Sequence, residues 1–331
     1  MAQEVRWGIV GLGSIAHTFA KDLALVSGGT LTAVASRSID KAKEFANEYG
    51  VEHTFDSYDA LFDSNEVDVV YIATPHTSHE SLSVKAMEKG KHVLCEKPMG
   101  VNPEQVEQMI AVAEKNKVFL MEALWSRFNP SIQKTKQLVQ NGEIGSIGFI
   151  YADFAFYALG RDAENRLLNP NLAGGSLLDI GIYPIFLSYL MLGMPKKIQA
   201  SSHFYKTGVE MQTSMIFEYE NAQAILYSGL NSKSEMKAEI SGSEGSIFLH
   251  SRWHEAQGYT IEKQGELIDY GLPTHGRGYT YEIEEVQDCL ISGQLQSNIW
   301  SHQNSKDLAR LLYEVRQKSG VIFPFEEQKQ A

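Results

Sequence analysis

Residues 5–16 of the chain read VRWGIVGLGSIA, and this stretch decides the fold of the first part of the protein. Residues 5–10 are mostly apolar and predict a buried strand, whereas residues 14–26 carry apolar side chains at helical spacing. Between the predicted strand and helix lies the pattern G-x-G-x-x-A. At the first strand-to-helix turn of a parallel sheet, this pattern is typical of a loop that binds the pyrophosphate of a dinucleotide.

The residues of this glycine loop have separate expected tasks. Gly11 makes the tight turn, Gly13 lets the backbone approach a pyrophosphate, and Ala16 permits close packing of helix on sheet. Ser14 and Ile15 open the helix, whose free N–H groups and positive dipole end face the anion. We therefore expect Gly11, Gly13, Ser14 and Ile15 to bind the cofactor. The alternative is a glycine turn with a purely structural role.

Strand and helix patterns alternate through the first third of the chain. They predict strands over 31–36, 67–73, 92–96 and 118–122, and helices over 40–49, 78–89 and 103–116. Strands separated by helices of this length predict an N-terminal α/β domain over residues 1–124, a Rossmann fold with a doubly wound parallel sheet.

After about residue 124 the pattern changes. A helix is predicted near 130–140, followed by strands over 147–156, 198–205, 212–218, 223–230, 237–241, 246–249 and 259–263, and by closing helices over 281–291 and 305–318. We therefore predict an α+β domain over residues 125–331 for substrate binding and dimerisation, built on a large, mostly antiparallel sheet. An uncovered apolar sheet face is a liability in a monomer, so we expect a face-to-face homodimer through this sheet.

The amino-acid composition limits the binding partners and the cellular location that we expect for the protein. With 331 residues, of which 43% are hydrophobic, the chain can build two packed cores. Its 41 acidic residues outnumber its 29 basic ones, which argues against nucleic-acid and anionic-membrane partners. The most apolar run, 182–194, is shorter than the roughly 20 residues that span a bilayer, and the first residues do not resemble a signal peptide. Because Cys95 and Cys289 are expected to be reduced, we predict a cytoplasmic protein.

The end of the second predicted strand, Ser36-Arg37-Ser38, bears on the choice of cofactor. NAD enzymes of this fold usually place Asp or Glu there to bind the ribose 2′-hydroxyl. Arg37 can instead pair with a 2′-phosphate through its planar guanidinium, and Ser36 and Ser38 add hydroxyl donors. The alternatives are an ordinary surface arginine and a ribose contact from Asp40. We expect NADP(H) in preference to NAD(H).

Two further polar segments follow predicted strands: residues 73–79, ATPHTSH, and residues 96–98, EKP. In an open α/β sheet, ligands bind where such strand ends meet. Lys97 could there bind a substrate oxygen, stabilise negative charge on it, or depress a neighbour's pKa. On its spacing alone, Lys97 could equally be a surface lysine that caps a strand.

These segments carry a family resemblance. Thr74-Pro75 with His79, residues 90–98 (GKHVLCEKP) and the glycine loop together resemble the glucose–fructose oxidoreductase / inositol dehydrogenase (Gfo/Idh/MocA) family over the first 125 residues. In that family the lysine of the Glu-Lys-Pro motif lies in the active site, which implies a catalytic Lys97. His76 stands where many members have Asn, which leaves its role open.

Later segments resemble one branch of the family, the branch that contains dimeric dihydrodiol dehydrogenase and NADP-dependent D-xylose dehydrogenase. These segments are residues 121–128 (MEALWSRF), 166–170 (RLLNP) and 174–184 (GGSLLDIGIYP). Tyr183 takes the position at which most of the family has histidine. The resemblance implies cofactor contacts from Thr74, Pro75, His79, Glu96, Lys97, Trp125 and Arg127.

Alcohol oxidation suits Tyr183 as the acid/base. The O–H proton must be taken while a hydride leaves for the nicotinamide, and free tyrosine, with a pKa of about 10, is a poor base at neutral pH. The Lys97 ammonium would favour the phenolate and lower that pKa. If residues 177–190 form a helix, Asp179 lies on the same face and orients a substrate hydroxyl or the lysine. The alternatives are a core tyrosine and a helix-cap aspartate.

Aromatic side chains are expected to line the substrate pocket: Trp125, Phe154, Tyr157 and Tyr279. A place in the core of the sheet is an equal alternative for Phe154. His250 and His254 lie four residues apart but lack the further ligands that a zinc site needs, so we expect no metal.

Together these features predict an NADP-dependent oxidoreductase that transfers a hydride to or from a small hydroxylated substrate, which is a sugar, a polyol or a trans-dihydrodiol. The alternative is a non-catalytic NADP(H) sensor with the same fold. The set Lys97, Asp179 and Tyr183 favours the enzyme, because a sensor needs no proton donor. The identity of the substrate and the direction of the reaction stay open at this point.

Overall fold

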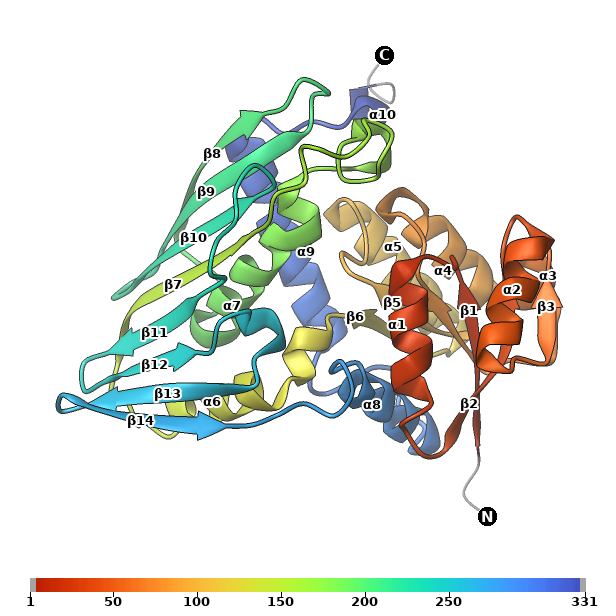
Figure 1. The fold of residues 1–331 in the computed structure, drawn as a ribbon, viewed down its shortest axis with the longest axis horizontal. Coiled ribbons are helices and arrows are strands. Elements are labelled where there is room, and N and C mark those ends of the chain that lie inside the picture. Colours follow the sequence, from red (N-terminus) through yellow and green to blue (C-terminus); the bar gives the residue numbers. More distant parts are fainter. Residues whose placement is uncertain (1–3, 328–331) are drawn as a thin grey trace. The chain divides into compact units, whose positions relative to one another are not determined.

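The computed structural model of the protein describes residues 4–327 (Figure 1). The chain divides into two compact units. The first, here called the Rossmann unit, contains the described residues up to Phe128 together with His275–Lys306. The second, here called the sheet unit, contains Asn129–Thr274 and the chain from Asp307 onward. The domain boundary predicted near residue 124 stays a prediction. Residues 275–306 belong to the Rossmann unit, although they come late in the sequence.

The Rossmann unit is built on a six-stranded sheet in the order β3-β2-β1-β4-β5-β6. Its strands are β1 (Val5–Val10), β2 (Gly29–Ala35), β3 (His53–Phe55), β4 (Val69–Ile72), β5 (His92–Glu96) and β6 (Leu120–Ala123). All of their pairings are parallel, which confirms the predicted doubly wound sheet. The strand order reverses between β1 and β4, and ligands of such sheets bind outside the carboxyl ends of the strands at this point.

Helices flank this sheet (Figure 1). They are α1 (Ser14–Leu23), α2 (Ile39–Tyr49), α3 (Tyr58–Asp63), α4 (His79–Glu88), α5 (Pro103–Asn116) and α8 (Thr280–Ile291). The sequence analysis missed β3 and α3, because three and six residues are too few to establish a period. Ser57 nevertheless caps α3, since its side chain accepts a hydrogen bond from the backbone N–H of Ala60.

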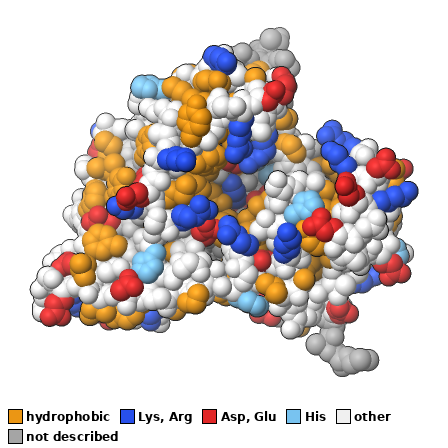
Figure 2. Space-filling view, viewed as in Figure 1, with side chains coloured by type: hydrophobic (Ala, Val, Ile, Leu, Met, Phe, Trp, Pro, Cys, Tyr) orange, Lys and Arg blue, Asp and Glu red, His pale blue; other side chains and the backbone are white. Residues whose placement is uncertain are grey.

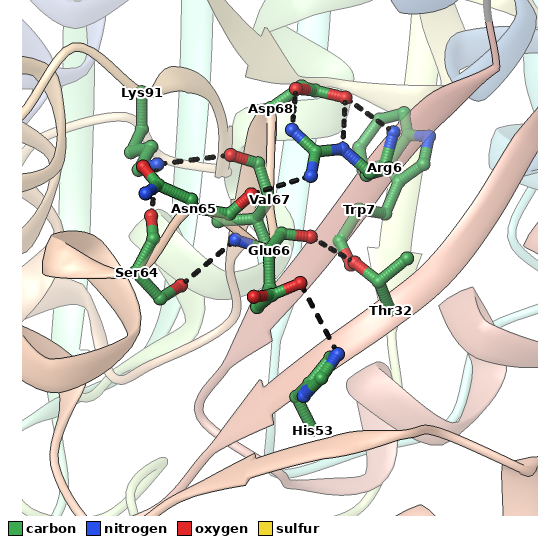
Figure 3. Close-up of polar contacts among 10 residues, drawn as sticks. All are labelled: Arg6, Trp7, Thr32, His53, Ser64, Asn65, Glu66, Val67, Asp68 and Lys91. Carbon is green, nitrogen blue, oxygen red and sulfur yellow. Dashed lines mark hydrogen bonds and ion pairs between the residues drawn. The ribbon is translucent and has the colours of Figure 1, made fainter.

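A polar network ties the amino ends of β1 and β4, at the edge of the sheet opposite the glycine loop (Figure 3). The Arg6 guanidinium donates to both carboxylate oxygens of Asp68, at 2.7 and 3.1 Å. The Lys91 ammonium donates to the carbonyl oxygens of Ser64 and Val67, at 2.6 and 3.1 Å. The charged side chains at that edge therefore serve the structure of the sheet, and the carboxyl edge is the one where ligands of such sheets bind.

The sheet unit is built on an eight-stranded sheet in the order β14-β13-β12-β11-β7-β10-β9-β8. Its strands are β7 (Ile147–Ala155), β8 (Lys197–Phe204), β9 (Glu210–Glu218), β10 (Gln223–Gly229), β11 (Ala238–Gly242), β12 (Ser246–Leu249), β13 (Gly258–Lys263) and β14 (Glu266–Gly271). Only β7 and β10 pair in parallel among its described strands, so the predicted mostly antiparallel sheet is confirmed. The sequence analysis missed β14, whose residues are all exposed and therefore show no alternation.

Helices cover one face of this sheet, as Figure 1 shows for α6 (Pro130–Gln140), α7 (Ile182–Leu192) and α9 (His302–Ser319). Alternate residues of β10 follow this arrangement, since Ala224 and Leu226 are buried whereas Ile225 is 44% exposed. Ile216 of β9 is also exposed. Hydrophobic side chains are visible at the surface over the strands of the sheet unit (Figure 2). The face that carries Ile216 and Ile225 is therefore not covered by helices within residues 4–327.

The apolar run that the sequence analysis placed at residues 182–194 is part of a longer stretch in the structure. It belongs to a helical stretch over Pro170–Leu192 of 23 residues, and an 18-residue window within it has a mean hydropathy of 1.5, which would suffice by length and composition for a membrane span. However, 78% of its apolar window is buried inside the protein. This is the environment of a core helix, and α7 packs on β7 and β10.

Candidate active site

The glycine loop has the geometry that pyrophosphate binding requires. Gly11 has a φ of +89°, and a Cβ there would lie 2.6 Å from the carbonyl oxygen of Ala73, so no other residue fits without strain. At Gly13, by contrast, a Cβ would meet no atom within 4 Å, which leaves open space beside the backbone. Gly13 is the N-cap of α1 and supplies no side-chain cap, so no side chain of the cap residue competes with an anion for the N–H groups at the start of the helix.

The turn after β2 leaves Arg37 available to a ligand. The hydroxyl of Ser36 accepts a hydrogen bond from the backbone N–H of Ser38, at 3.2 Å, and so shapes the turn. Arg37 is exposed and forms no ion pair or hydrogen bond with the described residues. Asp40, the alternative ribose contact, lies in the first turn of α2 and is also exposed. The arrangement suits a 2′-phosphate, because the guanidinium can turn toward it without breaking an existing contact.

His79 joins two of the predicted polar segments. It begins α4, and its ring is completely buried. The ring nitrogens lie 2.8 Å from the carbonyl oxygens of Pro98 and of Thr74. Because both nitrogens face backbone acceptors, the geometry gives His79 a role in holding the Thr74-Pro75 turn beside the Glu-Lys-Pro turn. A direct cofactor contact of His79 stays a prediction, and the buried His76 packs edge-on against its ring.

Two buried carboxylates hold the segment around Lys97. Glu96 accepts hydrogen bonds from the Tyr71 hydroxyl and from the backbone N–H of Lys97. Glu122 accepts one from the backbone N–H of Met99, at 2.9 Å. Burial raises the pKa of Glu122, and its hydrogen bonds and the Lys97 charge oppose this effect. Buried carboxylates therefore hold the backbone N–H groups of both Lys97 and Met99, which fixes the position of Lys97 at the carboxyl end of β5.

The sequence analysis did not assign a role to Glu122. Its second oxygen accepts hydrogen bonds from the indole N–H of Trp300, at 3.1 Å, and from the hydroxyl of Ser305, at 2.8 Å. Glu122 thus connects the turn after β5 with the segment 275–306, which returns to the Rossmann unit from far along the chain. The available signal was an acidic residue within an otherwise apolar strand, since β6 reads LMEA.

Trp125 and Tyr279 form a stacked pair in the Rossmann unit. Their ring centroids are 4.8 Å apart and their planes differ by 8°. Asp22, at the end of α1, fixes this pair because its carboxylate accepts hydrogen bonds from the backbone N–H groups of Arg277 and Tyr279. The structure therefore brings these two predicted pocket residues together, although 154 positions separate them in the sequence.

Arg127 has donors that the described residues leave unsatisfied. Its side chain is buried, and neither Nε nor Nη1 has a hydrogen-bond partner among residues 4–327. Burial lowers the pKa of the guanidinium to about 10. A buried cation without acceptors is costly, so this site is suited to an anionic group such as those of a dinucleotide. The cofactor role predicted for Arg127 fits this geometry.

Asp179 and Tyr183 lie at the junction of two kinds of helix in the sheet unit. The sequence predicted one regular helix over 177–190, but the segment Leu177–Gly181 is a π-helix that leads into α7. Gly181 packs closely at this turn, since a Cβ there would lie 2.9 Å from the hydroxyl oxygen of Ser228 on β10. Single π-turns inside helices are frequent at functional sites. Asp179 is buried and accepts a hydrogen bond from the Arg166 guanidinium, at 2.8 Å.

Tyr183 is buried in an aromatic cluster of the sheet unit. Its ring centroid lies 5.5 Å from that of Phe154 and 5.5 Å from that of His254. Phe154 and His254 are stacked on each other at 4.1 Å. Tyr157, predicted for the same pocket, is 56% exposed and has no ring contact with this cluster in the described structure, so its pocket role stays a prediction. The sequence analysis considered His254 only as a metal ligand.

A Rossmann unit with an open glycine loop, and a sheet unit with a buried tyrosine and aspartate, define a two-domain nicotinamide oxidoreductase. The chain belongs to the Gfo/Idh/MocA family of oxidoreductases. The family's N-terminal domain, described as "Oxidoreductase family, NAD-binding Rossmann fold", matches residues 5–124, and its C-terminal domain matches residues 132–248. This confirms the resemblance, the fold class and the prediction of an enzyme.

Relatives match nearly the whole chain. It is 34% identical to trans-1,2-dihydrobenzene-1,2-diol dehydrogenase of Mus musculus, over 97% of this chain and 98% of that protein. It is 31% identical to the NADP⁺-dependent scyllo-inositol 2-dehydrogenase IolU of Bacillus subtilis, over 98% and 99% of the two chains. A solved 3-ketoreductase from Actinomadura kijaniata, in complex with NADP and TDP-benzene, is similar in structure, with a TM-score of 0.87, 27% identity and coverage of 96% and 98%.

Proposed function

We propose that the protein is an NADP-dependent dehydrogenase or reductase that transfers a hydride between the nicotinamide and a CH–OH carbon of a sugar, a polyol or a trans-dihydrodiol. The observation that carries the proposal is the open space at Gly13 in front of the uncapped α1. The exposed Arg37 supports NADP over NAD. The relatives support both the cofactor and the substrate range, since their names include NADP, inositol and a dihydrodiol.

The chemistry follows from the proton and the hydride that an alcohol must lose. A bound NADP⁺ would supply the nicotinamide carbon as the acceptor for the hydride. Tyr183 accepts the hydroxyl proton as the general base and returns one as the general acid in the reverse reaction. Lys97 binds the reacting oxygen and favours the ionised phenol through its positive charge. Asp179, held by Arg166, orients the substrate through a hydrogen bond from one of its hydroxyl groups.

The cofactor contacts are assigned to residues of the Rossmann unit. Gly11, Gly13, Ser14 and Ile15 hold the pyrophosphate through backbone N–H groups at the start of α1. Ser36, Arg37 and Ser38 take the 2′-phosphate. The remaining contacts are assigned to Thr74, Pro75, His79, Glu96, Lys97, Trp125 and Arg127.

We also propose that the protein is a cytoplasmic homodimer. The uncovered face of the sheet unit carries Ile216 and Ile225, and a second copy of the same face would remove these side chains from water. Two buried, unpaired cysteines, Cys95 and Cys289, are consistent with a reducing compartment.

Replacement of Tyr183 by phenylalanine tests the catalytic assignment. Tyr183→Phe removes the hydroxyl and keeps the ring in its cluster, so kcat should fall by roughly 10²- to 10⁴-fold while NADP affinity stays near normal. Lys97→Met should also lower kcat, and the double variant should be less impaired than the product of the two effects, because residues that act as a unit are not additive. The assay follows NADPH absorbance with a panel of aldoses, polyols and dihydrodiols. An undiminished rate for Tyr183→Phe would make the tyrosine a core residue.

A further inference from the structure

His254 lies in the aromatic cluster around Tyr183, although the mechanism above gives it no task. It is part of a short turn, Trp253–Glu255, between β12 and β13. Its ring stacks on Phe154, with centroids 4.1 Å apart and planes that differ by 23°, and only 5% of the residue is exposed. The imidazole therefore lies beside the phenol ring to which we assign the proton transfer.

The backbone on either side fixes the place of this imidazole. The indole N–H of Trp253 donates to the carbonyl oxygen of Asp153 on β7, at 2.9 Å. The side-chain amide of Asn129 donates to the carbonyl oxygen of Ala256, at 3.1 Å. Arg252, just before the turn, has a φ of +62°, which a non-glycine residue keeps only where its surroundings enforce it. The turn is therefore over-determined, and the position of His254 is not the product of a mobile loop.

The polarity of His254 is what distinguishes it from its neighbours. A phenyl ring could stack on Phe154 equally well and would not require the burial of two polar nitrogens. A neutral imidazole offers one donor and one acceptor, which matches the one donor and the acceptor lone pairs of a hydroxyl group. Sugars, polyols and trans-dihydrodiols share one feature, a second hydroxyl on the carbon next to the one that reacts. A group beside Tyr183 that can bind a hydroxyl is placed to recognise this second hydroxyl.

We propose that His254 is a specificity-determining residue that binds the hydroxyl on the carbon adjacent to the reacting carbon, so that the enzyme selects vicinal diols over simple secondary alcohols. This inference rests on the proposed function, because it takes Tyr183 as the residue that exchanges the proton. Within that function it assigns to one side chain the recognition of the second hydroxyl that sugars, polyols and trans-dihydrodiols share.

A pair of alcohols that differ by one hydroxyl tests the inference. The probes are trans-1,2-cyclohexanediol and cyclohexanol, each assayed with NADP⁺. The wild-type protein should prefer the diol in kcat/KM. His254→Phe keeps the stacked ring and should reduce this preference by about two- to tenfold, because one hydrogen bond to a neutral group is lost. The loss should appear in kcat/KM for the diol and not for the simple alcohol. His254→Asn, which keeps a donor and an acceptor, should retain part of the preference.

His250→Phe is the matched control. His250 lies on the same segment, but its ring nitrogen is bound to Asp269 at the surface, at 2.8 Å, so the substitution should leave the preference unchanged. Thermal unfolding of each variant verifies that it is folded. An unchanged preference in folded His254→Phe, or equal rates of the wild-type protein with the two alcohols, would overturn the inference while leaving the proposed function in place. The proposed function would be overturned, and this inference with it, if the wild-type protein oxidised no alcohol of the wider panel and, when loaded with NADPH, bound none of them.

Discussion

Replacement of Glu210 by glutamine should stabilise the protein at alkaline pH and have little effect at acidic pH. Glu210 begins β9, and only 1% of the residue is exposed. One carboxylate oxygen accepts a hydrogen bond from the backbone N–H of Leu177, at 2.6 Å, and the other has no partner among the described residues. Burial raises the pKa of Glu210 to about 7, although backbone hydrogen bonds and the Arg316 charge oppose it.

The direction of this pH effect on stability follows from comparing the folded and the unfolded protein. In the unfolded chain the carboxyl group titrates near its ordinary value of 4.5, so the folded protein holds the proton more tightly. The stability that this proton contributes is fully present below about pH 4.5 and is lost as the pH rises through about 7. A pKa raised from 4.5 to about 7 corresponds to roughly 3 kcal/mol in the free energy of unfolding.

Glutamine keeps an oxygen that can accept from Leu177, but it does not ionise. Glu210→Gln should therefore match the wild-type protein near pH 5 and exceed its stability near pH 9 by up to roughly 3 kcal/mol. Urea unfolding midpoints at several pH values measure the difference. Glu218→Gln at the other end of β9 is the control, because Glu218 is partly exposed and paired with Lys197 at 3.1 Å. If the difference between Glu210→Gln and wild type were the same at both pH values, Glu210 would not be the buried neutral acid inferred here.

Three other predictions concern the cofactor, the assembly and the returning segment. Arg37→Ala should weaken NADP binding by about 1.5–3 kcal/mol, the usual value of a hydrogen bond to a charged group, and leave NAD binding nearly unchanged in calorimetric titrations; tighter binding of NAD than of NADP by the unmodified protein would contradict it. Sedimentation at micromolar concentration should give a dimer mass that Ile225→Glu lowers, and a monomer mass for the unmodified protein would refute the assembly. Asp22→Ala should lower the melting temperature, because it leaves two backbone N–H groups before α8 without their acceptor, whereas Asp40→Ala at the surface should not; equal melting temperatures would disprove this role of Asp22.

The sequence by itself determined the parts of the protein that rest on local chemistry. The glycine loop predicts a dinucleotide turn because its pattern is continuous in the sequence and because glycine readily adopts the positive φ that Gly11 has. The strands and helices of the Rossmann unit were predictable because their hydrophobic periods extend over whole elements. Lys97 and Tyr183 were predicted as catalytic residues from motifs that are continuous in the sequence.

Only the tertiary structure decided the features that depend on contacts between distant segments. Glu122 meets Trp300 and Ser305 across a long stretch of chain, and no local pattern signals such a pairing. The π-helix around Asp179 lies where Gly181 comes close to β10, a contact that the sequence does not reveal, and the sequence period alone predicted a regular helix. The position of His254, stacked on Phe154 and beside Tyr183, likewise depends on the tertiary structure. The physical reason is the same in each case: backbone preferences act on neighbours in the chain, whereas packing acts on neighbours in space.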